Sequence, residues 1–148
     1  MDRSLKHTET KKIIGRVEKI DLPDLFIFEI DAKIDTGAYT SSLHCHTITV
    51  EKIKGRLIVH FYVLDPNHPE YNDRQYEAPV HKIKRVRSSN GQIEERVIIK
   101  QKIKFFETQD TIQLSLTDRS KMKYPVLIGR RFLTNKFVVD VSQKFLSK

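Results

Sequence analysis

The most informative segment of the chain is Ala32-Lys33-Ile34-Asp35-Thr36-Gly37-Ala38-Tyr39-Thr40-Ser41-Ser42-Leu43. An apolar run over residues 26–34 ends at the carboxylate of Asp35, and Thr-Gly-Ala follows at once. Gly37 permits a tight turn and leaves space beside the acid. The hydroxyl groups that follow could orient the carboxylate. The pattern predicts a strand that presents Asp35 as a catalytic acid, although the same residues also suit an ordinary turn after a strand.

A second stretch has a related pattern: Tyr124-Pro125-Val126-Leu127-Ile128-Gly129-Arg130-Arg131-Phe132-Leu133. Its apolar residues predict a short buried strand that ends at Gly129. A short helix over residues 130–135 is expected to follow, and helical signals are scarce in the rest of the chain.

The dominant period elsewhere is two residues. Residues 111–117 alternate strictly between polar and apolar side chains, as a strand with one buried face does. Residues 56–63 alternate on a mostly apolar background, which predicts a strand covered on both faces. Gly55 and the Asn90-Gly91 pair predict two hairpin turns, the second of which joins residues 81–87 to residues 92–106. This pattern indicates an all-β fold, either closed or sandwiched.

The length of 148 residues predicts one domain over residues 1–148. Residues 1–12 are polar, so a flexible N-terminus without a secretion signal is expected. No apolar run approaches the roughly 20 residues that are needed to span a bilayer. A single cysteine excludes an internal disulfide. These features predict a cytoplasmic protein that has no membrane partner.

Charge narrows the class of partner. Lys and Arg number 27 against 19 Asp and Glu, which gives a net charge of +8. A field of that sign attracts polyanions such as nucleic acid, the ribosome surface or an acidic peptide. Aromatic residues such as Phe61, Tyr62, Phe105 and Phe106 lie in apolar runs and are predicted to be core residues. Nucleic acid is therefore expected as a partner only indirectly, through the ribosome.

Three stretches in order, residues 33–44, 85–96 and 122–133, resemble the retropepsin-like aspartic peptidases. The resemblance is closer to the RimK-associated group that is also called ATP-dependent zinc proteases. It implies a small closed retropepsin-like β-barrel with one short C-terminal helix, and Asp35, Thr36 and Gly37 as the catalytic triplet. It also implies an activity, the removal of glutamates that a RimK-type ligase adds to the C-terminal tail of a small-subunit ribosomal protein.

An aspartic mechanism requires two neighbouring carboxylates, one to activate water and one to protonate the substrate carbonyl. The chain contains a single Asp-Thr-Gly, and the nearest second candidate, Asp140-Val141-Ser142, lacks the glycine. A second copy of Asp35 must then come from a two-fold partner. The hypothesis therefore predicts a homodimer.

Basic and polar residues in the family-like stretches are candidates for binding an acidic tail: Arg85, Arg87, Arg96, Arg130, Arg131, Ser41 and His44. An arginine fork can hold a carboxylate through two parallel hydrogen bonds. Arg85 and Arg87 share a strand face, and Arg96 lies on the facing strand, so these three could form a clamp. Each arginine could equally be a solvated surface charge. Glu95 is expected either to form an ion pair with Arg96 or to act as a second acid.

Zinc and ATP have little support in the sequence. His44-Cys45-His46 is the densest group of possible metal ligands, but no Cys-x-x-Cys or His-Glu-x-x-His motif supplies the rest of a site. Cys45 is predicted to be a small core residue. No phosphate-binding Gly-x-x-x-x-Gly-Lys-[Ser/Thr] loop occurs. No cofactor and no metal are therefore expected.

Two alternatives to the peptidase remain open. In the first, the chain is a non-catalytic basic β-domain that binds the ribosome, RNA or a glutamate ligase, and the Asp-Thr-Gly turn is structural. In the second, it is a zinc metallopeptidase. Replacing Asp35 separates the first alternative from the aspartic peptidase, and a chelator tests the second.

Overall fold

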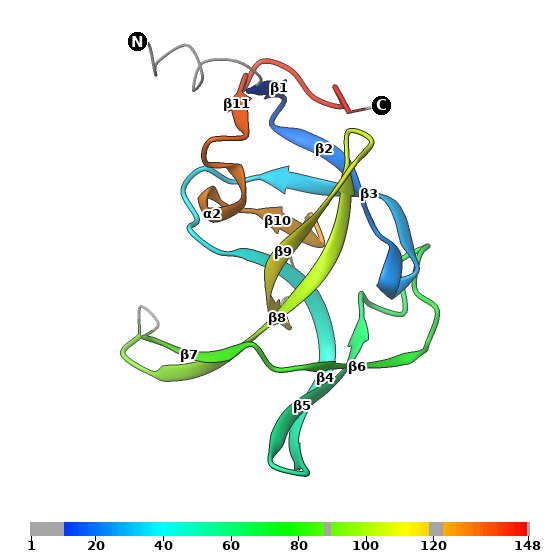
Figure 1. Cartoon of the computed structure of the whole chain (residues 1–148), viewed down its shortest axis with the longest axis vertical. Coiled ribbons are helices and arrows are strands. Elements are labelled where there is room, and N and C mark those ends of the chain that lie inside the picture. The colour runs from blue at the N-terminus through cyan, green and yellow to red at the C-terminus, as the bar shows by residue number, and fades with distance from the viewer. Residues whose placement is uncertain (1–10, 88–89, 119–122, 148) are drawn as a thin grey trace.

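The computed structural model describes residues 11–87, 90–118 and 123–147. Strands dominate, as the sequence predicts (Figure 1). The elements in chain order are β1 Lys12–Ile14, β2 Val17–Leu22, the 3₁₀ turn η1 Pro23–Leu25, β3 Ile27–Ile34, β4 Ser41–Ile53, β5 Arg56–Val63, β6 Gln75–Pro79, β7 Lys82–Arg87, β8 Ile93–Phe105, β9 Thr108–Thr117, β10 Val126–Ile128, the helix α2 Arg130–Leu133 and β11 Phe137–Val139.

The main sheet closes into a barrel. Its hydrogen-bonded neighbours run in the order β10, β3, β2, β8, β9 and β4. The ring closes because β10 pairs with β3 in parallel and also with β4 in antiparallel orientation. The predicted closed all-β barrel with one short helix is thus confirmed. Closure leaves these six strands without a free edge at which another chain could add.

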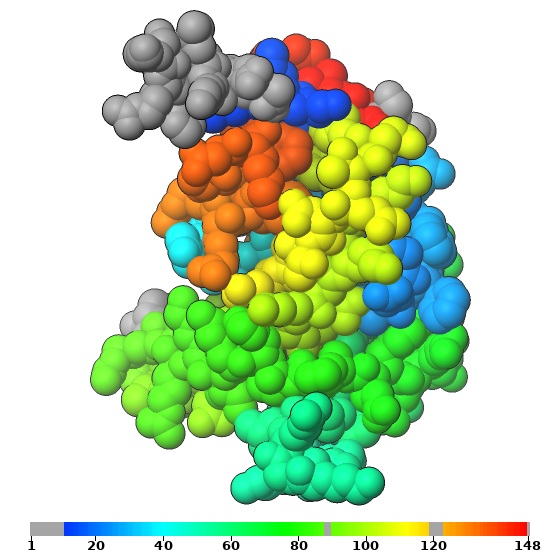
Figure 2. All heavy atoms as spheres, viewed as in Figure 1, coloured from blue at the N-terminus to red at the C-terminus, as the bar shows by residue number. Residues whose placement is uncertain are grey.

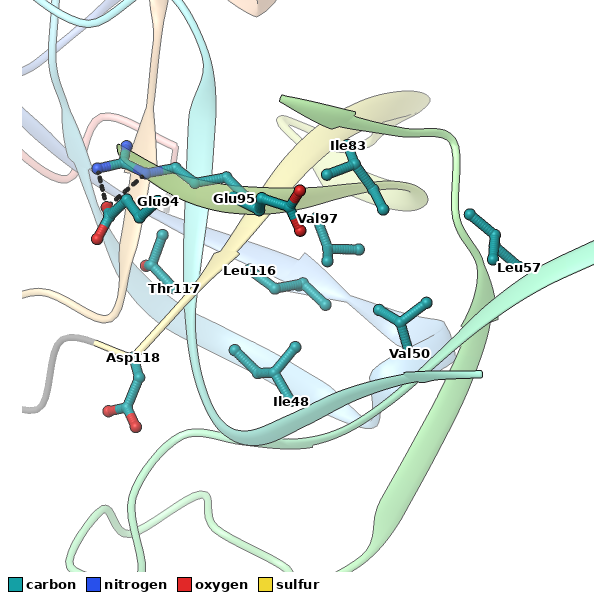
Figure 3. A pocket seen from close by; sticks show the side chains of 11 residues that line it. Ile48, Val50, Leu57, Ile83, Glu94, Glu95, Val97, Leu116, Thr117 and Asp118 are labelled. Atoms are coloured by element: carbon teal, nitrogen blue, oxygen red, sulfur yellow. Dashed lines mark hydrogen bonds and ion pairs between the residues drawn. The ribbon is translucent and has the colours of Figure 1, made fainter. Parts of the chain in front are cut away.

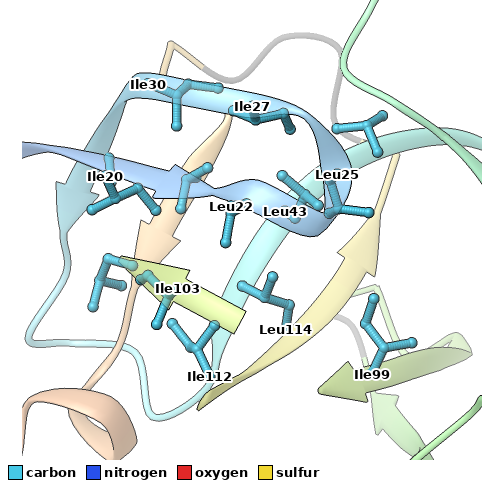
Figure 4. Packing of buried hydrophobic residues seen from close by; sticks show 14 of the residues in the cluster. Ile20, Leu22, Leu25, Ile27, Ile30, Leu43, Ile99, Ile103, Ile112 and Leu114 are labelled. Atoms are coloured by element: carbon cyan, nitrogen blue, oxygen red, sulfur yellow. The ribbon is translucent and has the colours of Figure 1, made fainter. Parts of the chain in front are cut away.

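Alternating apolar residues fill the barrel. On β9, Ile112, Leu114 and Leu116 are buried, as the period of two predicts. Figure 4 shows Ile112 and Leu114 pointing toward Ile103 and Leu22, which lie on β8 and β2. Residues far apart in the chain therefore share one apolar cluster, and burying such side chains is the main source of the fold's stability.

Two hairpins extend beyond the barrel. Lys54 and Gly55 form the turn between β4 and β5, with φ angles of 52° and 81°. The predicted strand over residues 56–63 coincides with β5, but Arg56 and Leu57 at its start are exposed. From residue 58 onward one face is buried and the other only half-buried. The second hairpin joins β7 to β8, and Gly91 in its turn has a φ of 86°. Figures 1 and 2 show the β4–β5 hairpin projecting from the body of the molecule.

The two ends of the described chain are bound to the barrel. Lys12, which falls in the segment expected to be flexible, pairs with Phe137 in a small parallel sheet. Glu18 is fully buried, and its carboxylate accepts hydrogen bonds from the backbone N–H groups of Gly15, Leu146 and Ser147. Residues 1–10 of the expected flexible segment lie outside the described residues.

The helix α2 is shorter than the predicted 130–135. It ends at Leu133, where the Thr134 hydroxyl and backbone N–H both donate to the carbonyl of Arg130. Among the described residues, no helix is long and apolar enough to cross a membrane.

Candidate active site

Asp35 lies in a tight turn immediately after β3. Its backbone N–H donates to the carbonyl of Ile128 on the neighbouring strand β10, at 2.9 Å. The Gly37 N–H donates to Asp35 Oδ1 at 3.0 Å, and the Ala38 N–H donates to the Asp35 carbonyl at 3.2 Å. A Cβ at position 37 would lie 3.3 Å from Asp35 Oδ1, so glycine leaves the carboxylate room, as the sequence predicts.

Backbone N–H groups at the start of α2 donate hydrogen bonds to the Asp35 turn. The Arg130 N–H donates to the Ala38 carbonyl at 2.8 Å, and the Arg131 N–H donates to the Tyr39 carbonyl at 2.9 Å. Gly129 is required for this close approach because a Cβ there would lie 2.8 Å from both carbonyl oxygens. The two stretches singled out in the sequence therefore pack directly on each other.

Ser41 belongs to this support. Its side chain is buried, and its Oγ accepts a hydrogen bond from the Gly129 N–H at 2.9 Å. Ser41 was predicted to contact substrate, but the structure places it behind the Asp35 turn. Its hydroxyl satisfies a buried backbone donor that would otherwise be unpaired.

The Asp35 side chain lines a small cavity of about 160 Å³ between the barrel and the β7–β8 hairpin. Two cations, Lys84 and Arg96, reach this cavity from the hairpin. The lining residues are Asp35, Ala38, Thr40, Ser42, Lys84, Val86, Arg96, Ile98, Ser115, Thr117 and Leu127. Among them Asp35 is the single carboxylate.

Two buried hydroxyls in the same cavity have unused hydrogen-bonding capacity. Ser115 Oγ and Thr117 Oγ1 have no hydrogen-bond partner among the described residues. Buried hydroxyls without a partner are unfavourable unless water or a ligand satisfies them. A polar group bound in the cavity could therefore bond to both β9 residues.

The arginines of the hairpin do not form the single-faced clamp that the sequence suggested. In the β7–β8 register, Arg96 lies opposite Lys84, and Arg85 lies opposite Glu95. Directly opposed residues point to the same side of a sheet, so Arg85 and Arg87 lie on the face away from Arg96. Lys84, which the sequence analysis missed, takes the place beside Arg96.

Arg96 also has a different partner from the one expected. Its Nε and Nη2 donate to the carboxylate of Glu94 at 3.1 and 2.8 Å. Glu95 instead lies 3.7 Å from Arg85 Nε. The predicted Glu95–Arg96 ion pair is therefore wrong, because neighbouring residues on a strand point to opposite faces.

Arg130 and Arg131 surround the outer side of the Asp35 turn. Arg130 Nη1 donates to the Thr36 carbonyl at 3.0 Å, and Arg131 Nη1 donates to the Tyr39 hydroxyl at 3.2 Å. Both guanidinium groups lie within 6 Å of the centre of the Tyr39 ring, at 5.8 and 5.9 Å. These contacts stabilise the turn. The cations that line the Asp35 cavity, Lys84 and Arg96, instead belong to the β7–β8 hairpin.

The possible metal ligands on β4 are separated. His44 is buried, with Nε2 2.9 Å from Asp65 Oδ2, and it lines a different cavity from Asp35. The His46 ring stacks on Tyr62 and Tyr71. Cys45 is a core residue as predicted, and burial, with a smaller effect of Asp118, raises the pKa of its thiol.

A zinc ion does not fit this arrangement. Within the described part of the chain, no group of three or more His, Cys, Asp or Glu side chains could hold a metal ion. A protein zinc site normally uses three or four such ligands.

Comparisons with known proteins agree with this geometry. A model of the RimB-like family, described as the retropepsin-like aspartic endopeptidase RimB, matches residues 13–148. The chain is 36% identical over 142 residues to a probable alpha-L-glutamate ligase of Shewanella halifaxensis, and 35% identical over 134 residues to one of Parasynechococcus marenigrum. The matches cover 93% and 88% of this chain but only 30% and 28% of those relatives.

A solved structure has the same fold. The crystal structure of a Legionella pneumophila protein of unknown function matches with a TM-score of 0.74 and 29% sequence identity. The match covers 94% of this chain and 100% of that protein.

Proposed function

The chain belongs to the RimB-like family of retropepsin-like aspartic endopeptidases, and from this premise we propose that it is a homodimeric aspartic peptidase acting on an acidic protein tail. The observation that carries the proposal is the placement of Asp35. Its carboxylate lines a cavity that also contains Lys84 and Arg96, and the turn that bears it is bonded to β10 and α2.

A homodimer would supply the second carboxylate. Asp140, the other candidate in the sequence, follows β11, where its N–H donates to the Ile14 carbonyl, and it is not among the residues that line the Asp35 cavity. Thr36 and Gly37 are exposed, so a second copy can approach the turn. Two turns related by a two-fold axis would bring two Asp35 side chains together.

The proposed reaction is peptide hydrolysis by this pair. One Asp35 carboxylate accepts a proton from water as the water oxygen bonds to the substrate carbonyl carbon. The protonated Asp35 of the other copy donates to the carbonyl oxygen. The tetrahedral intermediate then collapses and the C–N bond breaks. The leaving nitrogen takes the proton that the first Asp35 accepted from water, and an intermediate hydroxyl returns a proton to the second Asp35. The products are a carboxylate and a free amine.

The cations support an acidic substrate. Lys84 and Arg96 would offset the repulsion between substrate carboxylates and the aspartate pair. A glutamate side chain of the substrate can exchange with Glu94 as the partner of Arg96, because the Arg96–Glu94 pair is partly exposed, at 28% and 57% of the two side chains.

The relatives suggest where such a tail comes from. Curated relatives are named probable alpha-L-glutamate ligases, and this chain spans about 30% of their length. We therefore propose a functional link to a RimK-type glutamate ligase and, as substrate, the glutamylated C-terminal tail of a small-subunit ribosomal protein. A reducing compartment suits the single cysteine, so the proposed setting is the cytoplasm.

The deciding experiment uses a C-terminally glutamylated peptide and mass spectrometry. Wild-type protein is expected to remove glutamates, and Asp35→Asn should lower the rate by about 10⁴-fold or more. Asp140→Asn is the matched control and should stay within about twofold of wild type. A chelator should have no effect.

Each other outcome identifies an alternative. Activity that survives in Asp35→Asn would refute the aspartic mechanism, and loss of activity only with the chelator would favour a metallopeptidase. Binding of the tail without cleavage by wild type would favour a non-catalytic binding domain. A strictly monomeric active protein in analytical ultracentrifugation would refute the shared site.

A further inference from the structure

The two faces of the β7–β8 hairpin differ in chemistry. Lys84 and Arg96 lie on the face that lines the Asp35 cavity. The opposite face carries Ile83 and Val97, which are register partners, and Glu95. This second face has no part in the proposed reaction, yet it lines a larger cavity of its own.

This second cavity is a groove of about 590 Å³ between the β7–β8 and β4–β5 hairpins. Figure 3 shows apolar side chains from the two hairpins and from β9 facing one another across it. Its apolar lining consists of Ile48, Val50, Leu57, Ile83, Val97 and Leu116.

The apolar lining is partly open to solvent. Val97 and Leu116 are buried and form its floor, whereas Val50, Leu57 and Ile83 expose 39%, 41% and 38% of their surface. Large apolar side chains gathered in this way on a protein surface commonly mark a binding site. The volume is sufficient for one or two large apolar side chains.

Carboxylates border the same groove. Glu94, Glu95 and Asp118 line it together with a single cation, Arg96. Figure 3 shows the Glu95 carboxylate next to Val97, and Asp118 at the opposite edge from Leu57. Glu94 is paired with Arg96, and Glu95 lies 3.7 Å from Arg85 Nε, so three carboxylates against two arginines leave one net negative charge at the groove. This excess disfavours another acidic segment and favours a ligand that carries lysine or arginine beside an apolar side chain.

The groove adjoins the Asp35 cavity around the β7–β8 hairpin, because Arg96 and Thr117 line both. One extended polypeptide could therefore occupy the two together. Its acidic residues would lie by Lys84 and Arg96, and its apolar and basic residues would lie between the hairpins.

We infer that the groove between the β4–β5 and β7–β8 hairpins is a second binding site for the substrate polypeptide, and that it takes an apolar side chain flanked by a basic residue. The inference deepens the proposed function, on which it rests for the acidic part of the substrate. The acidic tail would identify the bond to be cut, and the groove would select the protein that carries the tail.

Binding of fluorescent peptides to the full-length Asp35→Asn protein tests the site without cleavage. One peptide set carries a Leu-Lys anchor, two to six glycine or serine residues and a glutamate tail, and a second set has Ser-Ser in place of Leu-Lys. Anisotropy is expected to show about tenfold tighter binding for the best anchored peptide, because burying a leucine contributes about the corresponding free energy.

Substitutions at exposed groove residues locate the effect. Leu57→Ser and Ile83→Ser should each remove most of the gain from the anchor, whereas Val138→Ser, at an apolar residue that is 50% exposed outside this groove, should retain it. Glu95→Lys should reverse the preference, so that a Leu-Glu anchor binds better than Leu-Lys. Circular dichroism checks that each variant is folded.

The inference is overturned if the anchored and unanchored peptides bind equally at every spacing, or if the gain persists in folded Leu57→Ser and Ile83→Ser. Failure of the proposed function looks different. In that case wild-type protein would cleave none of the peptides, while the anchor would still tighten binding through the groove.

Discussion

The turns at Asp35 and Asp140 share one local hydrogen bond but differ in the residues that surround them. In the Asp35 turn, the N–H of Gly37 donates to the Asp35 carboxylate at 3.0 Å. In the Asp140 turn, the N–H of Ser142 donates to the Asp140 carboxylate at the same distance. Each turn directly follows a strand, β3 in the first case and β11 in the second.

The Asp140 carboxylate accepts its hydrogen bonds from residues of its own turn. It also accepts the Ser142 hydroxyl at 2.6 Å and the Gln143 side-chain amide at 3.2 Å. These hydrogen bonds, from the Ser142 hydroxyl first and then from its N–H and from Gln143, hold the pKa of Asp140 below its usual value. The Asp140 turn therefore has the character of a structural turn.

The Asp35 turn instead depends on distant residues. Ile128, Gly129 and Arg130 hold its backbone, and Lys84 and Arg96 line the cavity that its carboxylate enters. Similar turn chemistry thus serves two purposes, and the difference comes from the surrounding barrel. Three substitutions test the difference between the Asp35 turn and the Asp140 turn.

The largest effect is expected from Gly129→Ala. The new methyl group would lie 2.8 Å from the carbonyl oxygens of Ala38 and Tyr39, so the Asp35 turn must move. We expect a loss of about 2–3 kcal/mol in the free energy of unfolding. Cleavage should fall by more than about tenfold, because small displacements of catalytic groups are costly. Denaturant unfolding and peptide cleavage measure the two effects, and wild-type activity in the variant would contradict the supporting role of α2.

A smaller effect is expected from Ser41→Ala. The substitution leaves the Gly129 N–H without its acceptor, and an unsatisfied buried donor costs about 1–2 kcal/mol. Cleavage should fall only modestly, because the backbone bonds from Arg130 and Arg131 remain. Chemical denaturation gives the change in stability. Ser41→Thr, which keeps the hydroxyl, is the matched control, and an equal loss in both variants would argue against the hydrogen bond.

The smallest effect is expected from Asp140→Asn, and it should depend on pH. Because the folded-state pKa of Asp140 lies below its unfolded value, the ionised carboxylate stabilises the fold above the unfolded pKa, which is about 3.9. That contribution is lost as the pH falls through the folded-state pKa. The variant should therefore melt at a lower temperature than wild type at pH 7, and the difference should narrow below about pH 4. A difference in melting temperature that stays constant between pH 7 and pH 3 would contradict this assignment.

Much of the fold follows from local patterns in the chain. The strand over residues 56–63, the strict alternation of residues 111–117 and the glycine turns at positions 55 and 91 all occur where the sequence predicts them. The residues predicted to bind substrate fared differently. Ser41 and His44 are both buried away from the Asp35 cavity. Lys84 lines the cavity with Arg96, whereas its neighbours Arg85 and Arg87 lie on the other face of the hairpin.

The strand register explains why the cations near Asp35 differ from those that the sequence predicts. Side chains alternate across a strand, so a change of one residue in pairing exchanges the two faces of a hairpin. The sequence does not reveal whether Arg96 lies opposite Lys84 or Arg85, and this single choice decides which cations reach Asp35. The sequence also does not reveal that the carboxylate of Glu18 is buried and accepts hydrogen bonds from three backbone N–H groups, which come from both ends of the described chain.

The β-strands, the tight turn at Asp35 and the need for glycine near it follow from the amino-acid order alone, because periodicity and turn chemistry act between close neighbours in the chain. Three other features depend on the three-dimensional fold: which carboxylate lines a cavity, which cations line it too, and which apolar side chains stay exposed nearby. These depend on strand register and barrel closure, which bring together residues as distant as Asp35, Arg96 and Gly129.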